Sequence, residues 1–292
     1  MTLLATDSRS DVVSPPRSDW QARLYAGFAD DGGTTRLVDR SHVGPLRIQK
    51  PLYPEGPAVC HAIVVHPPGG VVGGDQLTIH ADVGTHAHAL MATPGAAKWY
   101  KANGRVSRQE VRLTIGAGAS LEWLPQETIF FNHAHVQLDT CIDLAADAHY
   151  IGCEILCFGR TASGESFNAG TVSQKNMIRR GGKLIWFEQG SLDGGSSARS
   201  SPLVLADKTV CATLTAVGKT LSAASITALR EELAAVANNH AGIGVTQLKS
   251  LLVVRYLGDA SETARRVMIR AWQHVRPELL GRDAIVPRIW NT

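Results

Sequence analysis

The sequence lacks long apolar runs and a strong excess of charge of either sign. No stretch approaches the ~18 consecutive apolar residues of a membrane-spanning helix, and the net charge is only +3 over 292 residues. No cluster of Lys and Arg stands out that would mark a nucleic-acid surface. The composition therefore predicts a globular protein with a sizeable core, and it favours neither a membrane protein nor a nucleic-acid-binding protein.

Cysteine is also scarce, and the five cysteines form an odd, scattered set. Without a secretion signal, such a set predicts reduced thiols and a cytosolic protein. Cys153 and Cys157 are spaced so that a strand would place both on one face, where we expect buried free thiols. A thiolate metal site would require a second Cys or His pair nearby, and the sequence alone reveals none.

The first 19 residues lack the apolar core of a signal peptide. They are polar and contain Pro15-Pro16, which predicts a disordered tail at 1–19. Residues 20–292 are predicted to form a single domain. Within it, the pattern indicates a β-rich body up to about residue 220 and a helix–strand–helix part at 221–292.

Recognised catalytic motifs are lacking as well. There is no H-E-x-x-H, no G-x-S-x-G and no nucleophile at a recognisable spacing from a base. The glycine-rich stretch after residue 65 lacks the Lys-Ser/Thr and the G-x-G-x-x-G of phosphate-binding loops. Instead, the apolar run at 62–65 predicts a buried strand followed by a tight strand-to-strand connection. The structural residues of this connection are Pro67, Pro68, Gly69, Gly70, Gly73, Gly74 and Asp75.

Apolar and polar residues alternate with period two in many short segments between residues 20 and 189. Examples are 46–49 and 111–115, each bounded by Gly or Pro. This pattern indicates an antiparallel or coiled all-β structure rather than βαβ units. A Gly- and Ser-rich stretch at 190–201 is predicted to be flexible.

Two helices are predicted after residue 220. The first has Ser225 as its N-cap and Gly242 as its stop. Its apolar face is Ile226, Leu229, Leu233 and Val236. A strand at 251–257 precedes the second helix, which Asp259 or Ser261 would cap, Pro277 would end or bend, and Gly281 would close. Its predicted buried face is Ala264, Val267, Ala271, Trp272 and Val275.

Two pairs of histidines invite a metal interpretation. His86 and His88 are two residues apart, as are His133 and His135. On a strand, each pair would project to one face and could bind Ni, Zn or Cu through imidazole nitrogens. The small neighbouring residues also fit exposed edges or turns, and an adventitious surface pair is the alternative.

Three carboxylates lie in apolar surroundings. Glu154 and Glu188 each alternate with apolar residues in a predicted strand, and Glu127 precedes the apolar run at 129–131. The residues expected on the same faces are Leu156 and Phe158 for Glu154, and Leu184 and Trp186 for Glu188. A carboxylate on such a face must be paired, protonated or hydrated in a cavity.

Two interpretations of these carboxylates stay open. One is a structural ion pair with an arginine such as Arg160 or Arg179. The other is an internal, hydrated acidic path that handles a hard or borderline cation.

Five stretches in order carry a resemblance to a known family. They are HPPGGVVGGD (66–75), TPGAAKWY (93–100), WLPQETIFF (123–131), FGRTASGESFNAG (158–170) and PRIWNT (287–292). With them the chain resembles the urease accessory protein UreD, also called UreH, from about residue 20 onward.

The resemblance implies a mainly β fold of stacked sheets with a β-helix-like architecture, plus two α-helices in the C-terminal region. It also implies a non-enzymatic scaffold that binds urease apoprotein, UreF and the GTPase UreG in a heteromeric cytoplasmic complex. Such proteins deliver nickel through an internal water-filled tunnel, with nickel in transit and no tightly bound cofactor. Glu154, Glu188 and Glu127 are then candidates for the nickel path.

Two alternatives belong to other functional classes. A metal-dependent hydrolase on a β-helical body would use the histidine pairs and Glu127. A stand-alone nickel chaperone would bind the metal through the four histidines.

Overall fold

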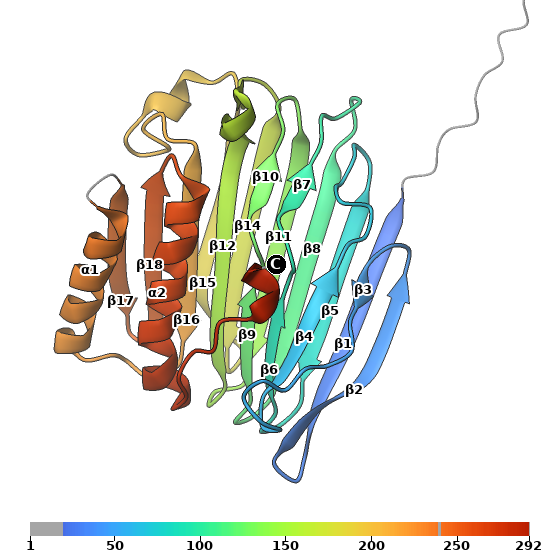
Figure 1. Ribbon diagram of the computed structural model, residues 1–292, viewed down its shortest axis with the longest axis vertical. Coiled ribbons are helices and arrows are strands. Elements are labelled where there is room, and N and C mark those ends of the chain that lie inside the picture. Colours follow the sequence, from blue (N-terminus) through green and yellow to red (C-terminus); the bar gives the residue numbers. More distant parts are fainter. Residues whose placement is uncertain (1–19, 239–240, 292) are drawn as a thin grey trace, which may run out of the picture.

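The computed structural model describes residues 20–238 and 241–291. About half of the described chain forms strands in two stacked sheets, and two helices lie near the C-terminus (Figure 1). The predicted disorder of residues 1–19 falls outside the described residues. Within the described ranges, no helix combines the length and the apolar character that crossing a membrane requires.

The first sheet has seven strands in the order β15-β14-β11-β8-β5-β1-β2. They are β1 (Gln21–Asp31), β2 (Thr34–Val43), β5 (Gln76–Val83), β8 (Ser107–Ile115), β11 (His135–Leu144), β14 (Thr171–Arg180) and β15 (Lys183–Asp193).

The second sheet has the order β17-β18-β16-β12-β9-β6-β4-β3. These strands are β3 (Arg47–Ile48), β4 (Cys60–Val65), β6 (His88–Ala92), β9 (Ser120–Leu124), β12 (His149–Arg160), β16 (Val210–Val217), β17 (Gly242–Leu248) and β18 (Leu251–Gly258). Three short strands attach to it through β12, namely β7 (Ala97–Trp99), β10 (Thr128–Phe130) and β13 (Glu165–Ser166).

The chain winds between the two sheets as a β-helix does. Strand β4 is followed by β5 in the opposite sheet, β6 by β8, β9 by β11 and β12 by β14. Corresponding strands of successive turns pair in parallel, for example β5 with β8 and β6 with β9. The predicted mainly β, β-helix-like fold is therefore confirmed. Its turns differ in length, since β5, β8, β11 and β14 begin at residues 76, 107, 135 and 171, and no fixed repeat marks the sequence.

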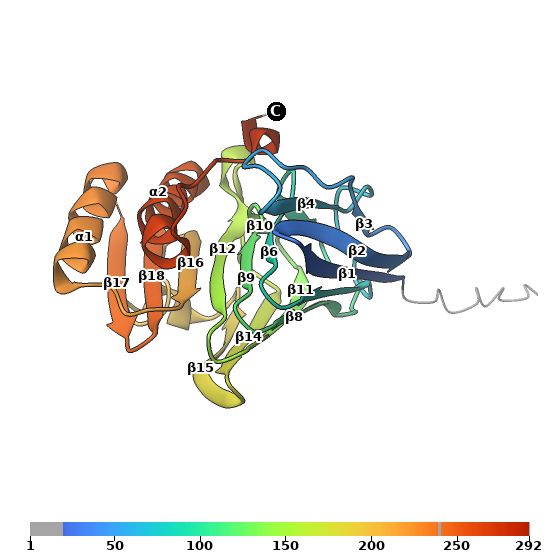
Figure 2. The ribbon, with the colours of Figure 1, turned by 90° about the horizontal axis from the view of Figure 1, so that it is seen from below.

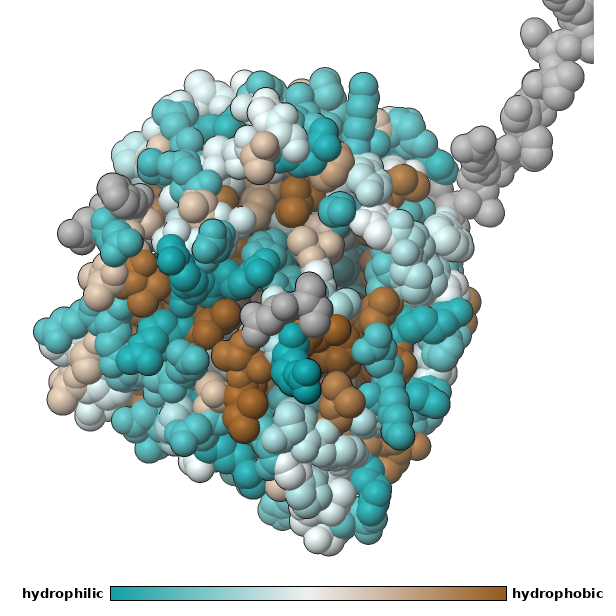
Figure 3. All heavy atoms as spheres, viewed as in Figure 1, coloured by the Kyte–Doolittle hydropathy of each residue, from teal (hydrophilic) through white to brown (hydrophobic). Residues whose placement is uncertain are grey.

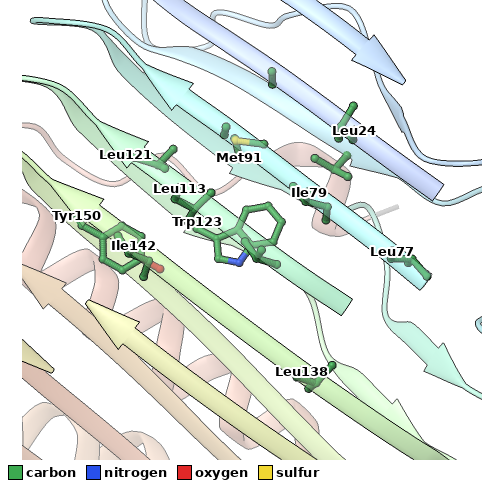
Figure 4. Packing of buried hydrophobic residues seen from close by; sticks show 14 of the residues in the cluster. Leu24, Leu77, Ile79, Met91, Leu113, Leu121, Trp123, Leu138, Ile142 and Tyr150 are labelled. Carbon is green, nitrogen blue, oxygen red and sulfur yellow. The ribbon is translucent and has the colours of Figure 1, made fainter. Parts of the chain in front are cut away.

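Period-two alternation produces an apolar core between the sheets. Residues such as Leu113, Ile142 and Trp123 project from both sheets into this layer, where they are buried (Figure 4). A second core lies on the other face of the second sheet, under helices α1 (Ala223–Ala237) and α2 (Ser261–Leu280) (Figure 2). The outward surface over these helices is mainly hydrophilic (Figure 3).

The predicted helices are present, but their ends differ from expectation. The N-cap of α1 is Ser222, whose hydroxyl accepts a hydrogen bond from the Ser225 amide at 3.1 Å, and Asn238 ends the helix in a left-handed conformation. Gly242 instead begins β17. The helix stops earlier than predicted because Asn, like Gly, can end a helix in the left-handed conformation.

Neither Asp259 nor Ser261 caps helix α2 as predicted; Ser261 is the first residue of the helix, and its N-cap is Ala260, without a side-chain hydrogen bond. Pro277 lies inside the last turn, and the helix continues to Leu280 before Gly281 closes it as predicted. The buried Leu279 anchors this last turn beyond the proline. All five residues predicted for the buried face of α2 are buried.

The stretch at 190–201, predicted to be flexible, is partly ordered by pairing. Its first residues complete β15, which ends at Asp193, and a short 3₁₀ turn spans Ser197–Ser200. The pairing of β15 with β14 overrides the Gly- and Ser-rich composition here.

Candidate functional site

Polar side chains interrupt the apolar core between the two sheets. They project inward because they occupy the same alternating positions that elsewhere carry Leu, Ile and Val. The polar positions are Gln109 on β8, Thr140 on β11, Asn176 on β14, Glu154 on β12, Glu188 on β15, and Thr213 and Thr215 on β16.

Three adjoining cavities follow these polar residues through the sandwich. The widest, about 450 Å³, and the central one, about 110 Å³, share Glu154, Leu156, Glu188 and Thr213 in their walls. The third, about 180 Å³, shares Thr93 and Gln109 among others with the central cavity. Each volume has room for water molecules, and the polar walls supply hydrogen-bond partners for them.

Glu154 lies where the widest and the central cavity meet. Its carboxylate accepts a hydrogen bond from Gln174 Nε2 at 2.5 Å and one from Asn176 Nδ2 at 3.4 Å. Burial raises the pKa of Glu154 to about 7, and the nearby charge of Glu188 adds to the rise, whereas the Gln174 hydrogen bond opposes it. Near neutral pH this carboxyl can therefore exchange a proton.

Glu188 lies at the wider end of the cavities, where its side chain is 31% exposed. Arg255 on β18 donates a hydrogen bond to Glu188 Oε1 at 2.6 Å. Leu184 does not share a face with Glu188 as expected, because a β-bulge between β14 and β15 shifts the register at Ile178 and leaves Leu184 exposed.

The arginines expected to pair with these carboxylates bind other groups. Arg160 donates to Glu165, and Arg179 forms an ion pair with Asp143 on the outer face of the first sheet. For Glu154 the observed partners are amides, and for Glu188 the partner is an arginine that the sequence had not singled out.

Glu127 faces away from the cavities. It is buried between the second sheet and α2, where Arg265 Nε donates to its carboxylate at 2.7 Å. The structure brings Glu154 and Glu188 together around one cavity and places Glu127 in a separate ion pair.

The loop from Pro67 to Asp75 walls the third cavity. Gly69 and Gly74 have positive φ values of 76° and 99°. A side chain at Gly70 would collide with the ring of Tyr100, because a Cβ there would lie 2.1 Å from a ring carbon. Asp75 accepts a hydrogen bond from the Val72 amide at 3.0 Å. These requirements explain the residue types of the loop, which connects β4 to β5 as predicted.

The second sheet is interrupted beside the central cavity. Strand β12 pairs with β9 up to Gly152 and with β10 from Leu156, and Pro125 lies in the connection between β9 and β10. Gln126 and Thr93, which both line the central cavity, connect the two sides of this gap in the sheet. The backbone amide of Gln126 donates a hydrogen bond to Thr93 Oγ1 at 2.9 Å. From the helix side, Trp290 covers the gap and donates through Nε1 to the Thr93 carbonyl at 3.2 Å.

The histidine pairs do not project from one strand face. His86 and His133 lie in turns with positive φ values of 60° and 63°. His88 is hydrogen bonded to Glu122 at 2.8 Å, and His135 to Thr171 at 2.9 Å. Among the described residues, no three His, Cys, Asp or Glu side chains come together as a ligand set for a metal ion. A metal role for either pair stays a prediction.

A buried network of charged residues under α2 was not predicted from the sequence. Arg276 donates to Glu122 at 3.0 Å and to Glu55 at 3.0 Å, while His61 and His88 are hydrogen bonded to these two carboxylates. The partners come from segments up to 221 residues apart. One feature of the sequence could have indicated this network. Arg276 directly follows Val275 in the buried stretch of α2, and a buried arginine requires carboxylate partners.

Comparison with known proteins identifies relatives over nearly the whole chain. A protein of Janthinobacterium sp. (strain Marseille), named urease accessory protein UreD, is 63% identical over 98% of this chain and 96% of its own length. Proteins of the same name from Nitrosospira multiformis and Dechloromonas aromatica are 55% and 45% identical, over 94% and 98% of this chain and 99% of each relative. The family model described as UreD urease accessory protein matches residues 21–291. The chain therefore belongs to the UreD family of urease accessory proteins.

Proposed function

We propose that this protein is a non-catalytic urease maturation factor that passes nickel ions through the cavities between its two sheets. The observation that carries the proposal is the pair of carboxylates, Glu154 and Glu188, in the shared wall of two adjoining cavities. Family membership supplies the context of urease maturation.

The chemistry of the cavity wall suits transit of a cation better than storage. A closed set of three or four strong ligands would hold a borderline cation such as nickel tightly. Two carboxylates accompanied by amides and hydroxyls would instead accept a hydrated ion and release it again. The raised pKa of Glu154 adds an exchangeable proton where the two cavities share a wall.

The partners in this proposal are urease apoprotein, UreF and the GTPase UreG, in a cytoplasmic heteromeric complex. A path through one protein is useful only if one end receives the ion and the other end faces the acceptor. The five free cysteines agree with a reducing compartment.

The test is urease activation in cells that express urease, UreF and UreG with this chain or its variants. We expect Glu154→Gln and Glu188→Gln to lower the nickel content and activity of the purified urease by roughly tenfold, because each removes a negative charge from a path of low dielectric. Glu127→Gln is the matched control, since Glu127 lies outside the cavities.

Assembly must be measured in the same samples. Pull-down of the complex distinguishes a blocked path from a lost partner, and circular dichroism of the isolated chain reports folding. Full nickel loading with both cavity variants, in assembled complexes, would refute the proposed path. Undiminished urease activity without this chain would refute the maturation role itself.

A further inference from the structure

Arg255 is placed at the mouth of the proposed path. It is the only cationic side chain in the wall of the widest cavity within the described chain. Its side chain is 47% exposed, so it lies between the interior carboxylates and solvent. On β18 it is paired with Thr213 of β16, which also lines the cavity.

The guanidinium of Arg255 is paired with Glu188, the carboxylate that an incoming cation would meet first. It donates to Glu188 Oε1 at 2.6 Å, and its central carbon lies 6.0 Å from the centre of the Trp186 ring. Its charge also reaches Glu154, the next carboxylate along the path, whose pKa it helps to lower against the effect of burial. A cation held at this point repels other cations and attracts anions.

The ion pair between Arg255 and Glu188 can open, so that another cation replaces Arg255 beside Glu188. Both side chains are partly exposed, and pairs of this kind contribute little to the stability of a fold. The flexible arginine stem allows the guanidinium to move into solvent and to leave Glu188 free for another cation.

We propose that Arg255 is a charge gate that sets which ions enter the widest cavity, and that its release from Glu188 opens the cavity to divalent cations. The gate regulates the path described under the proposed function and rests on it. Its test, however, measures entry of charged probes and requires neither urease nor nickel.

Cys211 provides the probe position. It lines the same cavity as Glu154, Glu188 and Arg255, and it is the only cysteine in the tryptic peptide 209–219. Methanethiosulfonate reagents transfer their thioalkyl group to a thiolate and release methanesulfinate, and they exist in cationic trimethylammonium and anionic sulfonate forms. Burial raises the pKa of the Cys211 thiol to about 12, but both reagents need the same thiolate, so the ratio of their rates reports the charge of the entrance.

Mass spectrometry of the 209–219 peptide would follow both reactions on the intact, full-length chain. We expect Arg255→Gln to raise the ratio of cationic to anionic modification rates by about tenfold, because a positive charge near the entrance acts on the two probes with opposite sign. Arg255→Lys, which keeps the charge, should stay within about twofold of the original chain. Arg112→Gln is the matched control, because it breaks an exposed Arg–Glu ion pair on the outer face of the first sheet.

An unchanged ratio in Arg255→Gln would overturn the gate. So would an equal shift of the ratio in Arg255→Gln, Arg255→Lys and Arg112→Gln, since the effect would then not follow the charge at the entrance. The ratio of modification rates and the nickel loading of urease can fail independently of each other. A shifted ratio together with full nickel loading of the Glu154→Gln and Glu188→Gln complexes would refute nickel transit and keep the gate. An unshifted ratio with lost loading would refute the gate alone.

Discussion

Two groups of carboxylates lie on opposite faces of the same sheet, and they differ in burial, in partners and in the direction of their pKa shifts. Glu154 on β12 faces the first sheet and the cavities, whereas Glu122 on β9 faces α2. Glu122 accepts hydrogen bonds from Arg276 and from Trp272 Nε1 at 2.6 Å, and it is completely buried. Glu154 has two amides as partners and a cavity beside it.

The pKa values of the two carboxyls move in opposite directions. Burial alone would raise the pKa of Glu122, but the interactions with His88 and Arg276 outweigh it and hold the pKa below its usual value. At Glu154, burial raises the pKa to about 7 because amides compensate only part of the lost hydration. A buried carboxylate whose oxygens are all paired with cationic side chains, like Glu122, has a structural role. A carboxylate beside a polar cavity, like Glu154, can take up and release a proton.

The largest effect should come from breaking the network under α2. Replacing Arg276 by Met would leave Glu122 and Glu55 buried without their shared cation, which we expect to lower the free energy of unfolding by about 3–5 kcal/mol. Urea denaturation followed by circular dichroism would measure it. Arg112→Met, at an exposed ion pair, should change stability by less than about 0.5 kcal/mol. A loss below 1 kcal/mol for Arg276→Met would show that the comparison overstates the role of this network.

The next largest effect is on the pH dependence of the free energy of unfolding, to which Glu154 and the network under α2 contribute with opposite sign. The unfolded chain releases the Glu154 proton near pH 4.5, whereas the folded protein keeps it to about pH 7. The folded state thus binds more protons in this window, and stability should fall by about 2–3 kcal/mol as the pH rises through it. The lowered pKa values of Glu122 and Glu55 act in reverse, so their contribution is present above pH 4.5 and lost on further acidification.

Glu154→Gln separates these two contributions. We expect the variant to lose the decline between pH 4.5 and 7 and to keep the loss of stability below pH 4.5. Urea titrations at several pH values would measure both. An unaltered decline in the variant would assign that slope to groups other than Glu154.

A smaller loss is expected at the third candidate carboxylate. Arg265→Met would leave the buried Glu127 without its bidentate partner and should cost about 1–2 kcal/mol, less than at Arg276 because Arg265 is partly exposed. Thermal unfolding of the variant would measure it. Nickel loading of urease, normalised to the amount of assembled complex, should be unaffected; a loading defect would place Glu127 on the path after all.

The smallest effect on stability is expected at the cavity mouth. Glu188→Gln removes one partner of a partly exposed ion pair and should change the free energy of unfolding by less than about 1 kcal/mol. Equilibrium unfolding of this variant and of Arg255→Gln would test it. A loss comparable to that of Arg276→Met would mean that the mouth is a structural element like the network under α2.

Local sequence predicted the elements and the faces of the strands. Alternation placed Glu154 on a face with Leu156 and Phe158, and helical spacing identified the buried face of α2. It failed at Leu184, where a bulge changes the register, and at the N-cap of α1, where Ser222 precedes Ser225 by one turn. Bulges and caps depend on partners or on single hydroxyl groups, which a periodic pattern does not encode.

The sequence by itself determined that this chain is a mainly β protein with two late helices, and its ordered motifs determined its family. Both follow from patterns that residues carry within a few positions of one another. Only the tertiary structure decided which of these carboxylates are paired with cations and which border a cavity, because Gln174 lies 20 residues from Glu154 and Arg276 lies 221 residues from Glu55. A side chain buried in either core has the same local pattern around it, and the partner across the layer decides whether its charge is fixed or free to exchange.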